Sequence, residues 1–249
     1  MDDQANYTSS GKHGHEKTWP SSHQEKHPVM EMEGRALSRP DELCSSRDLI
    51  SYTVRGTGKP LLLIHGWAMH AGVWAEAASE FSSQYQAITV DLRGHGASAS
   101  MPGPYTFATF ADDIRRLTEH LKLKNITAVG WSMGVSVLLK MLEAEASHID
   151  SLVFISGTPS FISREGYMHG VPPIIVQRLL RQIDRNYPSG LKNFHNILFT
   201  PEEQSSLQGS ALYAELTDLH AAPAKAAALE SLQCLQDERG KSTYAWLYF

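Results

Sequence analysis

The segment Gly130-Trp131-Ser132-Met133-Gly134 decides the fold of this 249-residue chain. It matches the pattern G-x-S-x-G, and its surroundings make the match specific. An apolar run over 126–129 predicts a buried strand before it, and residues 133–145 have the spacing of a helix. A sharp strand-to-helix turn with glycines on both sides lifts a serine hydroxyl above the end of a sheet. The segment therefore predicts Ser132 as a nucleophile in an α/β fold.

Strands and helices alternate around this segment. We expect strands over 49–54, 61–65, 87–91, 126–130 and 152–156. We expect helices over 71–81, 106–123 and 133–145. Short apolar runs such as 61–65 are typical of strands that are covered on both faces. The alternation predicts a mostly parallel sheet with helices on both faces.

The chain divides into four parts by composition. Residues 1–46 are polar and predict a disordered extension, whose histidines (His13, His15, His23 and His27) are expected to be solvated rather than metal ligands. Residues 47–159 are the α/β core. Residues 160–236 look helical from 172 onward, with breaks at 188–190, 201 and 223, and predict a lid over the site. Residues 237–249 form an apolar tail that is unlike the strand expected there.

Charge, cysteines and hydropathy exclude several classes of protein. The formal net charge of -5 gives no basic field for nucleic acid. Cys44 and Cys234 lack the spacing of a zinc site or disulfide scaffold, so a reducing cytoplasm is expected. Neither a secretory leader nor an apolar run of ~18 residues is visible, so no membrane contact is expected. We expect no metal and no cofactor.

Two further segments flank the expected site. His65-Gly66-Trp67 ends a strand, and in a fold with such a turn the loop there gives one oxyanion-hole N–H. Trp67 is placed to supply it, and the N–H of Met133 is the second donor. His65 is expected to be buried and bonded to nearby backbone. Residues 91–98 are glycine-rich and are expected to form a rigid loop beside the site, with His95 as a structural residue.

These elements, in this order, resemble the α/β-hydrolase superfamily over about residues 49–236. The sequence segments LLLIHGW, VDLRGHGAS and GWSMG most resemble those of the pimeloyl-acyl-carrier-protein methyl ester esterases of biotin synthesis. Those enzymes carry tryptophans that Trp67 and Trp131 match, and the resemblance implies that both contribute to substrate binding. The resemblance implies hydrolysis of a small or carrier-bound carboxylic ester by a Ser-His-Asp triad, without a cofactor.

The predicted lid carries a basic face. Arg178, Arg181 and Arg185 follow at i, i+3 and i+7, and an apolar stripe of Ile175, Leu179 and Ile183 is expected opposite them. The resemblance implies that such arginines receive the acidic carrier protein, and a guanidinium also suits phosphate or carboxylate. A merely solvated helix face explains the pattern equally well.

The triad acid and histidine are expected after the lid, where only thirteen residues remain and none is a histidine. We therefore expect a truncated or frameshifted product, with an apolar sheet edge open to self-association. His195, or His220 beside Asp218, could substitute as base only if the lid folds down. The alternative function is an impaired hydrolase fold that binds an acyl carrier or small ester without turnover. A lyase or perhydrolase would keep the fold, whereas Ser132 argues against dehalogenases and epoxide hydrolases.

Overall fold

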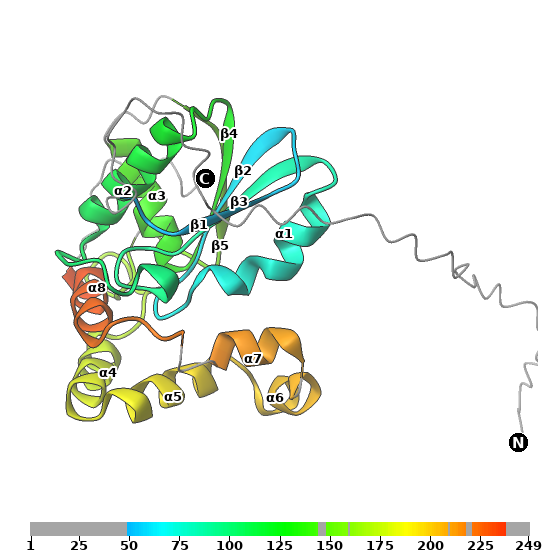
Figure 1. Cartoon of the computed structure of the whole chain (residues 1–249). Helices are drawn as coiled ribbons and strands as arrows, with labels where there is room; N and C mark the ends of the chain where they lie inside the picture. Colours follow the sequence, from blue (N-terminus) through cyan, green and yellow to red (C-terminus); the bar gives the residue numbers. More distant parts are fainter. Residues whose placement is uncertain (1–48, 144–147, 159, 209, 218–220, 238–249) are drawn as a thin grey trace, which may run out of the picture. The chain divides into compact units, whose positions relative to one another are not determined.

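The structure, a computed structural model, describes residues 49–143, 148–158, 160–208, 210–217 and 221–237. The predictions for 1–46 and for 238–249 fall outside these residues. The described residues form a five-stranded sheet, helices packed on the sheet, and a further block of helices (Figure 1). No helix in these ranges is long and apolar enough to cross a membrane.

The sheet has the strand order β1-β3-β2-β4-β5. Its strands are β1 (Tyr52–Arg55), β2 (Lys59–Ile64), β3 (Tyr85–Val90), β4 (Ile126–Trp131) and β5 (Ile149–Ile155). All neighbours are parallel except β1, which pairs antiparallel with β3. The mostly parallel sheet that the apolar runs predict is therefore confirmed.

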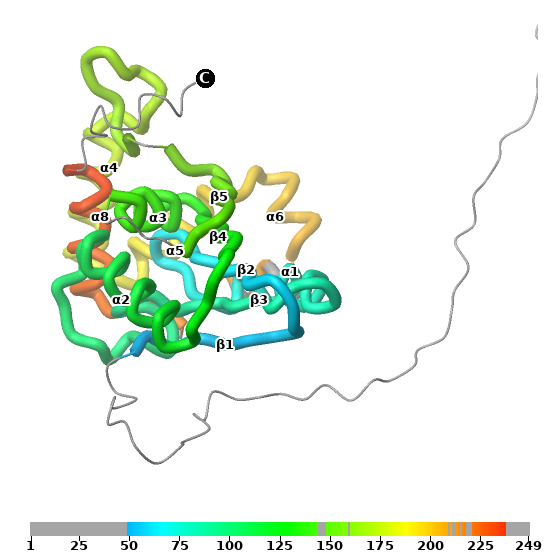
Figure 2. The backbone as a smooth tube through the Cα atoms, turned by 90° about the horizontal axis from the view of Figure 1, so that it is seen from above, coloured from blue at the N-terminus to red at the C-terminus, as the bar shows by residue number. Residues whose placement is uncertain are grey.

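Helices cover both faces of this sheet because side chains alternate along each strand. Leu62 and Ile64 of β2 belong to the large core with α2 (Phe107–His120) and α3 (Met133–Glu143). Leu61 and Leu63 belong to a smaller cluster with Ala78 of α1 (Ala75–Phe81). Figure 2 shows α1 on one side of the strands and α2 and α3 on the other.

The region after β5 is a block of helices, as predicted. They are α4 (Pro173–Arg185), α5 (Tyr187–Ile197), α6 (Pro201–Leu207), α7 (Ala211–Thr217) and α8 (Lys225–Asp237). The predicted break at 188–190 is wrong, because the chain breaks at Asn186. The Asn186 side chain accepts from the Ser189 N–H at 3.2 Å and caps α5. Pro188 lies within the first turn, where its missing N–H costs no hydrogen bond.

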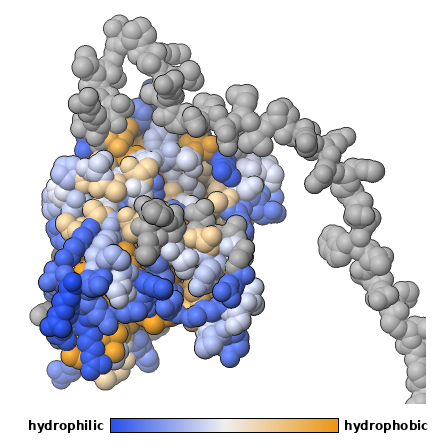
Figure 3. Space-filling model, turned by 60° about the horizontal axis from the view of Figure 1, so that its bottom comes forward, coloured by the Kyte–Doolittle hydropathy of each residue, from blue (hydrophilic) through white to orange (hydrophobic). Residues whose placement is uncertain are grey.

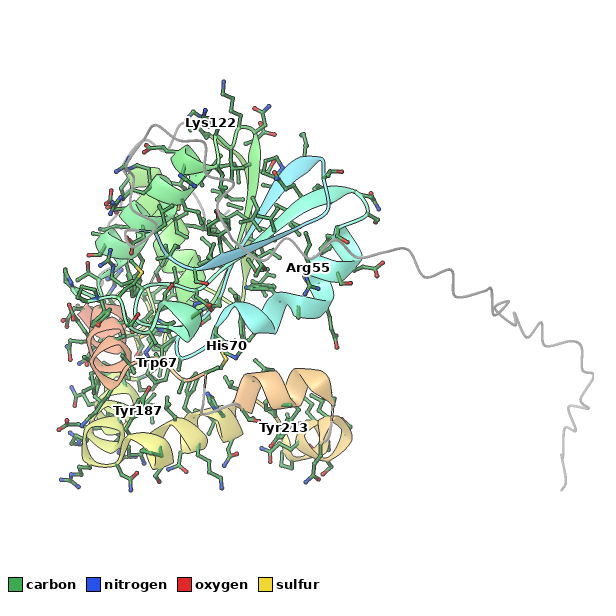
Figure 4. All side chains as sticks on the ribbon, in the orientation of Figure 1. Arg55, Trp67, His70, Lys122, Tyr187 and Tyr213 are labelled. Carbon is green, nitrogen blue, oxygen red and sulfur yellow. The ribbon has the colours of Figure 1, made fainter. Side chains whose placement is uncertain are left out.

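The helical block faces the carboxyl ends of the parallel strands. In Figure 4, Lys122, just before β4, lies at the far end of the sheet, whereas Trp67 and His70, just after β2, lie beside the block. At the edge of the sheet, the apolar side chains of Val153, Phe154 and Ile155 on β5 are 42%, 36% and 39% exposed. Within the described residues, β5 therefore presents an open apolar edge.

Candidate active site

Ser132 occupies a tight turn between β4 and α3. Its φ of 52° lies in the left-handed region, which residues other than glycine seldom adopt. The Ser132 N–H donates to the Ile155 carbonyl at 2.9 Å, and the Ser132 carbonyl accepts from the Val135 N–H at 2.9 Å. Such strain at a single half-buried serine is typical of a functional position. The strand–turn–helix setting that the motif predicts is therefore present.

Two glycines allow this turn to pack so closely. A Cβ on Gly130 would lie 2.6 Å from the carbonyl carbon and oxygen of Gly134. A Cβ on Gly134 would lie 2.6 Å from the carbonyl oxygen of Ile64, at the end of β2. Because these neighbours are backbone atoms, they cannot rotate away. The glycines on both sides of the serine are thus explained by close packing of strand and helix.

The loop after β2 lies directly beside Ser132. A Cβ on Gly66 would be 3.3 Å from the Ser132 Cβ. Trp67 follows in this loop, and Met133, on the other side of the serine, is the first residue of α3. N–H groups in the first turn of a helix have no intrahelical acceptor and are free to bind an anion. The structure thus places Ser132 next to Met133 and beside the loop that carries Trp67.

The two tryptophans of the predicted site have different surroundings. The Trp67 side chain is only 4% exposed, and its indole N–H donates to the Ala228 carbonyl of α8 at 3.0 Å. Its ring also meets Phe194 of α5 edge-to-face, with centroids 4.6 Å apart. Trp131 is half-buried and lies edge-to-face with Trp74, at 6.4 Å. Phe194, Ala228 and Trp74 were not found from the sequence, because contacts between distant segments leave no local pattern.

His65 is fully buried, and backbone groups use both of its ring nitrogens. Nδ1 lies 2.8 Å from the Gly66 carbonyl oxygen, and the Leu92 N–H donates to Nε2 at 3.1 Å. Nδ1 therefore carries the proton, and Nε2 cannot act as a base while it accepts from Leu92. Burial lowers the pKa of His65 to about 4. The predicted structural role of His65 is confirmed.

His95 is buried beside it, with the two rings 5.2 Å apart. Its Nδ1 lies 3.0 Å from the Arg93 carbonyl, and burial together with the charge of His65 lowers its pKa to about 3. Both histidines are therefore neutral near pH 7. Within the described ranges, no group of His, Cys, Asp and Glu side chains is arranged to hold a metal ion.

Asp91 fastens the loop over 91–98 to its surroundings. One carboxylate oxygen accepts from the Ala71 N–H at 2.7 Å and the other from the Ala97 N–H at 3.0 Å. In the same loop, Arg93 makes two hydrogen bonds to Asp113 of α2, at 2.8 and 2.6 Å. These bonds fit the rigid loop that the glycine-rich segment predicts.

The predicted lid residues lie on the outside of α4. Arg178, Arg181 and Arg185 are exposed, and none forms an ion pair with another residue of the described part. On the opposite side, Val176 and Ile183 are 2% and 0% exposed. Figure 3 brings this block of the molecule forward and shows hydrophilic residues gathered along one side of it. The three arginines, which we call the arginine stripe, therefore point away from the core.

The apolar stripe of α4 differs in part from its prediction. Ile183 is buried and Leu179 is half-buried, as expected, but Ile175 is 45% exposed. The helix turns its Val176 side toward the core, which is one residue further along. Ile175 consequently stands at the margin of the interface.

Of the two histidines predicted as substitute bases, the structure describes only His195. His195 of α5 is buried against the loop after β2. Burial lowers its pKa, and the neighbouring Ala68 backbone offsets part of this effect. Asp218 and His220 lie outside the described residues. A catalytic role for His195 stays a prediction.

The comparisons with known proteins agree with this geometry. The family model described as "alpha/beta hydrolase fold" matches residues 59–239. A pimeloyl-[acyl-carrier protein] methyl ester esterase of Nitrosospira multiformis is 29% identical over 143 residues, which are 56% of this chain and 54% of that protein. The protein of the same name from Nitrosomonas europaea is 27% identical over 154 residues, 61% of this chain and 58% of that protein. The chain thus spans just over half the length of these curated relatives.

Solved structures show the same fold. An esterase from Exiguobacterium antarcticum superimposes with a TM-score of 0.67 at 28% identity, covering 78% of this chain and 71% of that one. A bromoperoxidase from Bacillus anthracis superimposes with a TM-score of 0.69 at 25% identity, covering 74% and 68%. The fold predicted from the turn around Ser132 is therefore confirmed.

Proposed function

Because the chain belongs to the α/β-hydrolase fold family, we propose that it is a carboxylic ester hydrolase with Ser132 as its nucleophile. The position of Ser132 carries the proposal. The serine has a φ of 52° at the carboxyl end of β4, and the Gly66 loop lies against its Cβ. These two observations support a nucleophile elbow with an oxyanion loop beside it.

In the proposed reaction, the Ser132 Oγ adds to the ester carbonyl carbon. Negative charge develops on the carbonyl oxygen, and the N–H groups of Trp67 and Met133 are the donors that we assign to it. Loss of one such donor costs roughly 3 kcal/mol of barrier in a well-studied protease. The alcohol then leaves with a proton, and water releases the acid from the acylated serine.

A serine hydroxyl needs a general base to attack at a useful rate. The fold family places the acid and the histidine after the serine in chain order, beyond the helical block. In this chain α8 ends at Asp237, and the residues that follow lie outside the described part. His65 does not fill the role, because backbone groups occupy both ring nitrogens.

The substrate that we propose is a methyl ester carried on an acyl carrier protein. Two relatives are named for that activity, although the chain spans only 54% and 58% of their lengths. The arginine stripe supports a carrier rather than a free ester, because it lies opposite the buried side of α4. Three guanidinium groups directed into solvent suit the acidic surface of a protein partner. The helical block would then act as the lid.

The decisive test is hydrolysis of p-nitrophenyl butyrate by the chain and by its Ser132→Ala variant. We expect activity that the substitution removes. Equal, near-background rates would reject catalysis by this chain and favour the alternative, a protein that binds the ester or its carrier without turnover. Binding of a methyl-ester-loaded carrier, measured by calorimetry, then distinguishes these outcomes.

Two further parts of the proposal concern the surroundings of the molecule. We propose a cytoplasmic location, because Cys44 and Cys234 lack the sequence spacing of a disulfide scaffold. The open edge of β5 is proposed as a surface for self-association, because Val153, Phe154 and Ile155 are partly exposed there.

A further inference from the structure

We propose that the helical block positions the oxyanion donor of Trp67 by holding the Trp67 side chain. The inference rests on the proposed function and extends it. It assigns the Trp67 indole, Phe194 and the Ala228 carbonyl as positioning groups, which act through the Trp67 backbone rather than by touching the substrate.

The contacts of the indole carry this inference. Trp67 belongs to the loop after β2, but both partners of its ring belong to the helical block. Its N–H donates to the Ala228 carbonyl of α8 at 3.0 Å, and its ring meets Phe194 of α5 edge-to-face at 4.6 Å. The side chain is 4% exposed. Figure 4 shows Trp67 where the core meets the block.

The backbone of the loop is strained at this point. Beyond Trp67, Ala68 has a φ of 59°, which only surrounding contacts can maintain. The Met69 N–H donates to the Gly66 carbonyl at 3.3 Å, which is long for such a bond. Further along the loop, the Ala71 N–H donates to Asp91 at 2.7 Å. Between β2 and Ala71, the His65 ring also holds the loop, with Nδ1 2.8 Å from the Gly66 carbonyl, and the buried indole joins the loop to α5 and α8.

Anchoring by the block has a catalytic consequence. An oxyanion donor works only when it is held in place before charge develops, and a displacement of about 1 Å can cost ~10²-fold in rate. Movement of α5 and α8 away from the core would release the indole and thereby the donor. Docking of the helical block and assembly of the oxyanion hole are thus one event.

The test compares Trp67→Phe with Tyr187→Phe. The first keeps an aromatic ring and removes the indole donor. The second removes the hydroxyl that donates to the Pro223 carbonyl, a bond of the same kind that lies within the block. Hydrogen exchange of the segment 66–70 is measured in the intact chain, together with the Ser132-dependent kcat and KM for p-nitrophenyl butyrate.

We expect Trp67→Phe to speed exchange of 66–70 about tenfold, the effect of one hydrogen bond, and to lower kcat about tenfold while KM changes less than twofold. Tyr187→Phe leaves both quantities within about twofold. Equal exchange of 66–70 in Trp67→Phe and the unaltered chain would overturn the inference, as would equal effects of the two variants.

A second variant guards against misfolding of the first. Phe194 lies in the block, and Phe194→Leu removes its edge-to-face contact with Trp67 together with its ring contact with His195. Hydrogen exchange of 66–70 should therefore rise about threefold. If a folded Phe194→Leu protein shows no faster hydrogen exchange of 66–70, the helical block does not position Trp67. Exchange is independent of turnover, so absent Ser132-dependent activity rejects the proposed function while the exchange result still decides the inference.

Discussion

Around Ser132, backbone atoms approach so closely that Gly130 and Gly134 have no room for a Cβ, whereas the arginine stripe of α4 extends into solvent without an ion-pair partner in the described part. The first region is held by backbone hydrogen bonds and a buried core. The second has a core contact only on its far side, through Val176 and Ile183. The two regions belong to one chain but obey different physical requirements.

The difference follows from the work that each region is proposed to do. Stabilising a developing oxyanion requires donors that do not reorganise, and close packing provides this. Receiving a charged partner requires accessible charge that acts over several ångströms, which exposed arginines provide. Substitutions near Ser132 should therefore change stability and rate, whereas substitutions on the stripe should change recognition alone.

The largest effect is expected from Gly134→Val. Its Cβ would lie 2.6 Å from the Ile64 carbonyl oxygen, so β2 and α3 must separate. We expect a loss of about 3 kcal/mol in the free energy of unfolding, measured by urea denaturation. Gly166→Ala is the control, because its φ is 78° but no atom lies within 4 Å, and it should cost about 1 kcal/mol. Equal losses in the two variants would contradict close packing as the cause.

Acid should weaken the core beside the turn. Unfolded histidines titrate near 6.5, whereas burial lowers the pKa of His65 to about 4 and of His95 to about 3. Below pH 6.5 the unfolded chain therefore binds more protons than the folded chain, and stability falls as the pH drops toward 4. Between pH 7 and pH 5 the loss is about 2 kcal/mol for each histidine.

Thermal unfolding at the two pH values measures this loss. The variant His95→Gln should show a smaller dependence on pH, because one of the two buried titrating groups is gone. A melting temperature that is the same at pH 7 and pH 5 would refute the assignment.

The stripe should respond in a different assay. Replacing Arg178, Arg181 and Arg185 by alanine should raise KM for a carrier-bound methyl ester about tenfold. The KM for p-nitrophenyl butyrate should change by less than about twofold. The difference should shrink in high salt. Arg115→Ala is the matched control, since that exposed arginine pairs with Asp112 and Glu119. An unchanged KM for the carrier-bound ester in the triple variant would show that the arginine stripe does not recognise the carrier.

The smallest effect is expected at the edge of the sheet. Val153→Lys places a charge on β5, where the valine is 42% exposed, and should weaken self-association by about 1 kcal/mol or less. Sedimentation velocity over a range of concentrations measures it. If the unaltered chain is monomeric throughout that range, the edge does not mediate association.

Local pattern was enough to predict much of the fold. The five strands and the helices on the sheet follow from apolar periodicity. The predicted break at 188–190 is wrong because a proline can either end a helix or stand in its first turn. Within α5, Pro188 is instead part of the first turn, after the cap at Asn186. The sequence places Ile175 on the buried side of α4, but the residue is 45% exposed, because periodicity fixes a helix face only to within about one residue.

The sequence by itself determined the turn around Ser132, its glycines and the buried role of His65, because each depends on neighbours within a few positions. Only the tertiary structure decided that the Trp67 indole donates to the Ala228 carbonyl, 161 positions away, and that the Phe194 ring contacts the same indole edge-to-face. It also decided that the arginine stripe faces solvent. Contacts of this kind depend on how helices and strands from distant parts of the chain pack together. Hydrophobic periodicity does not predict which distant backbone carbonyl accepts a hydrogen bond from a buried donor.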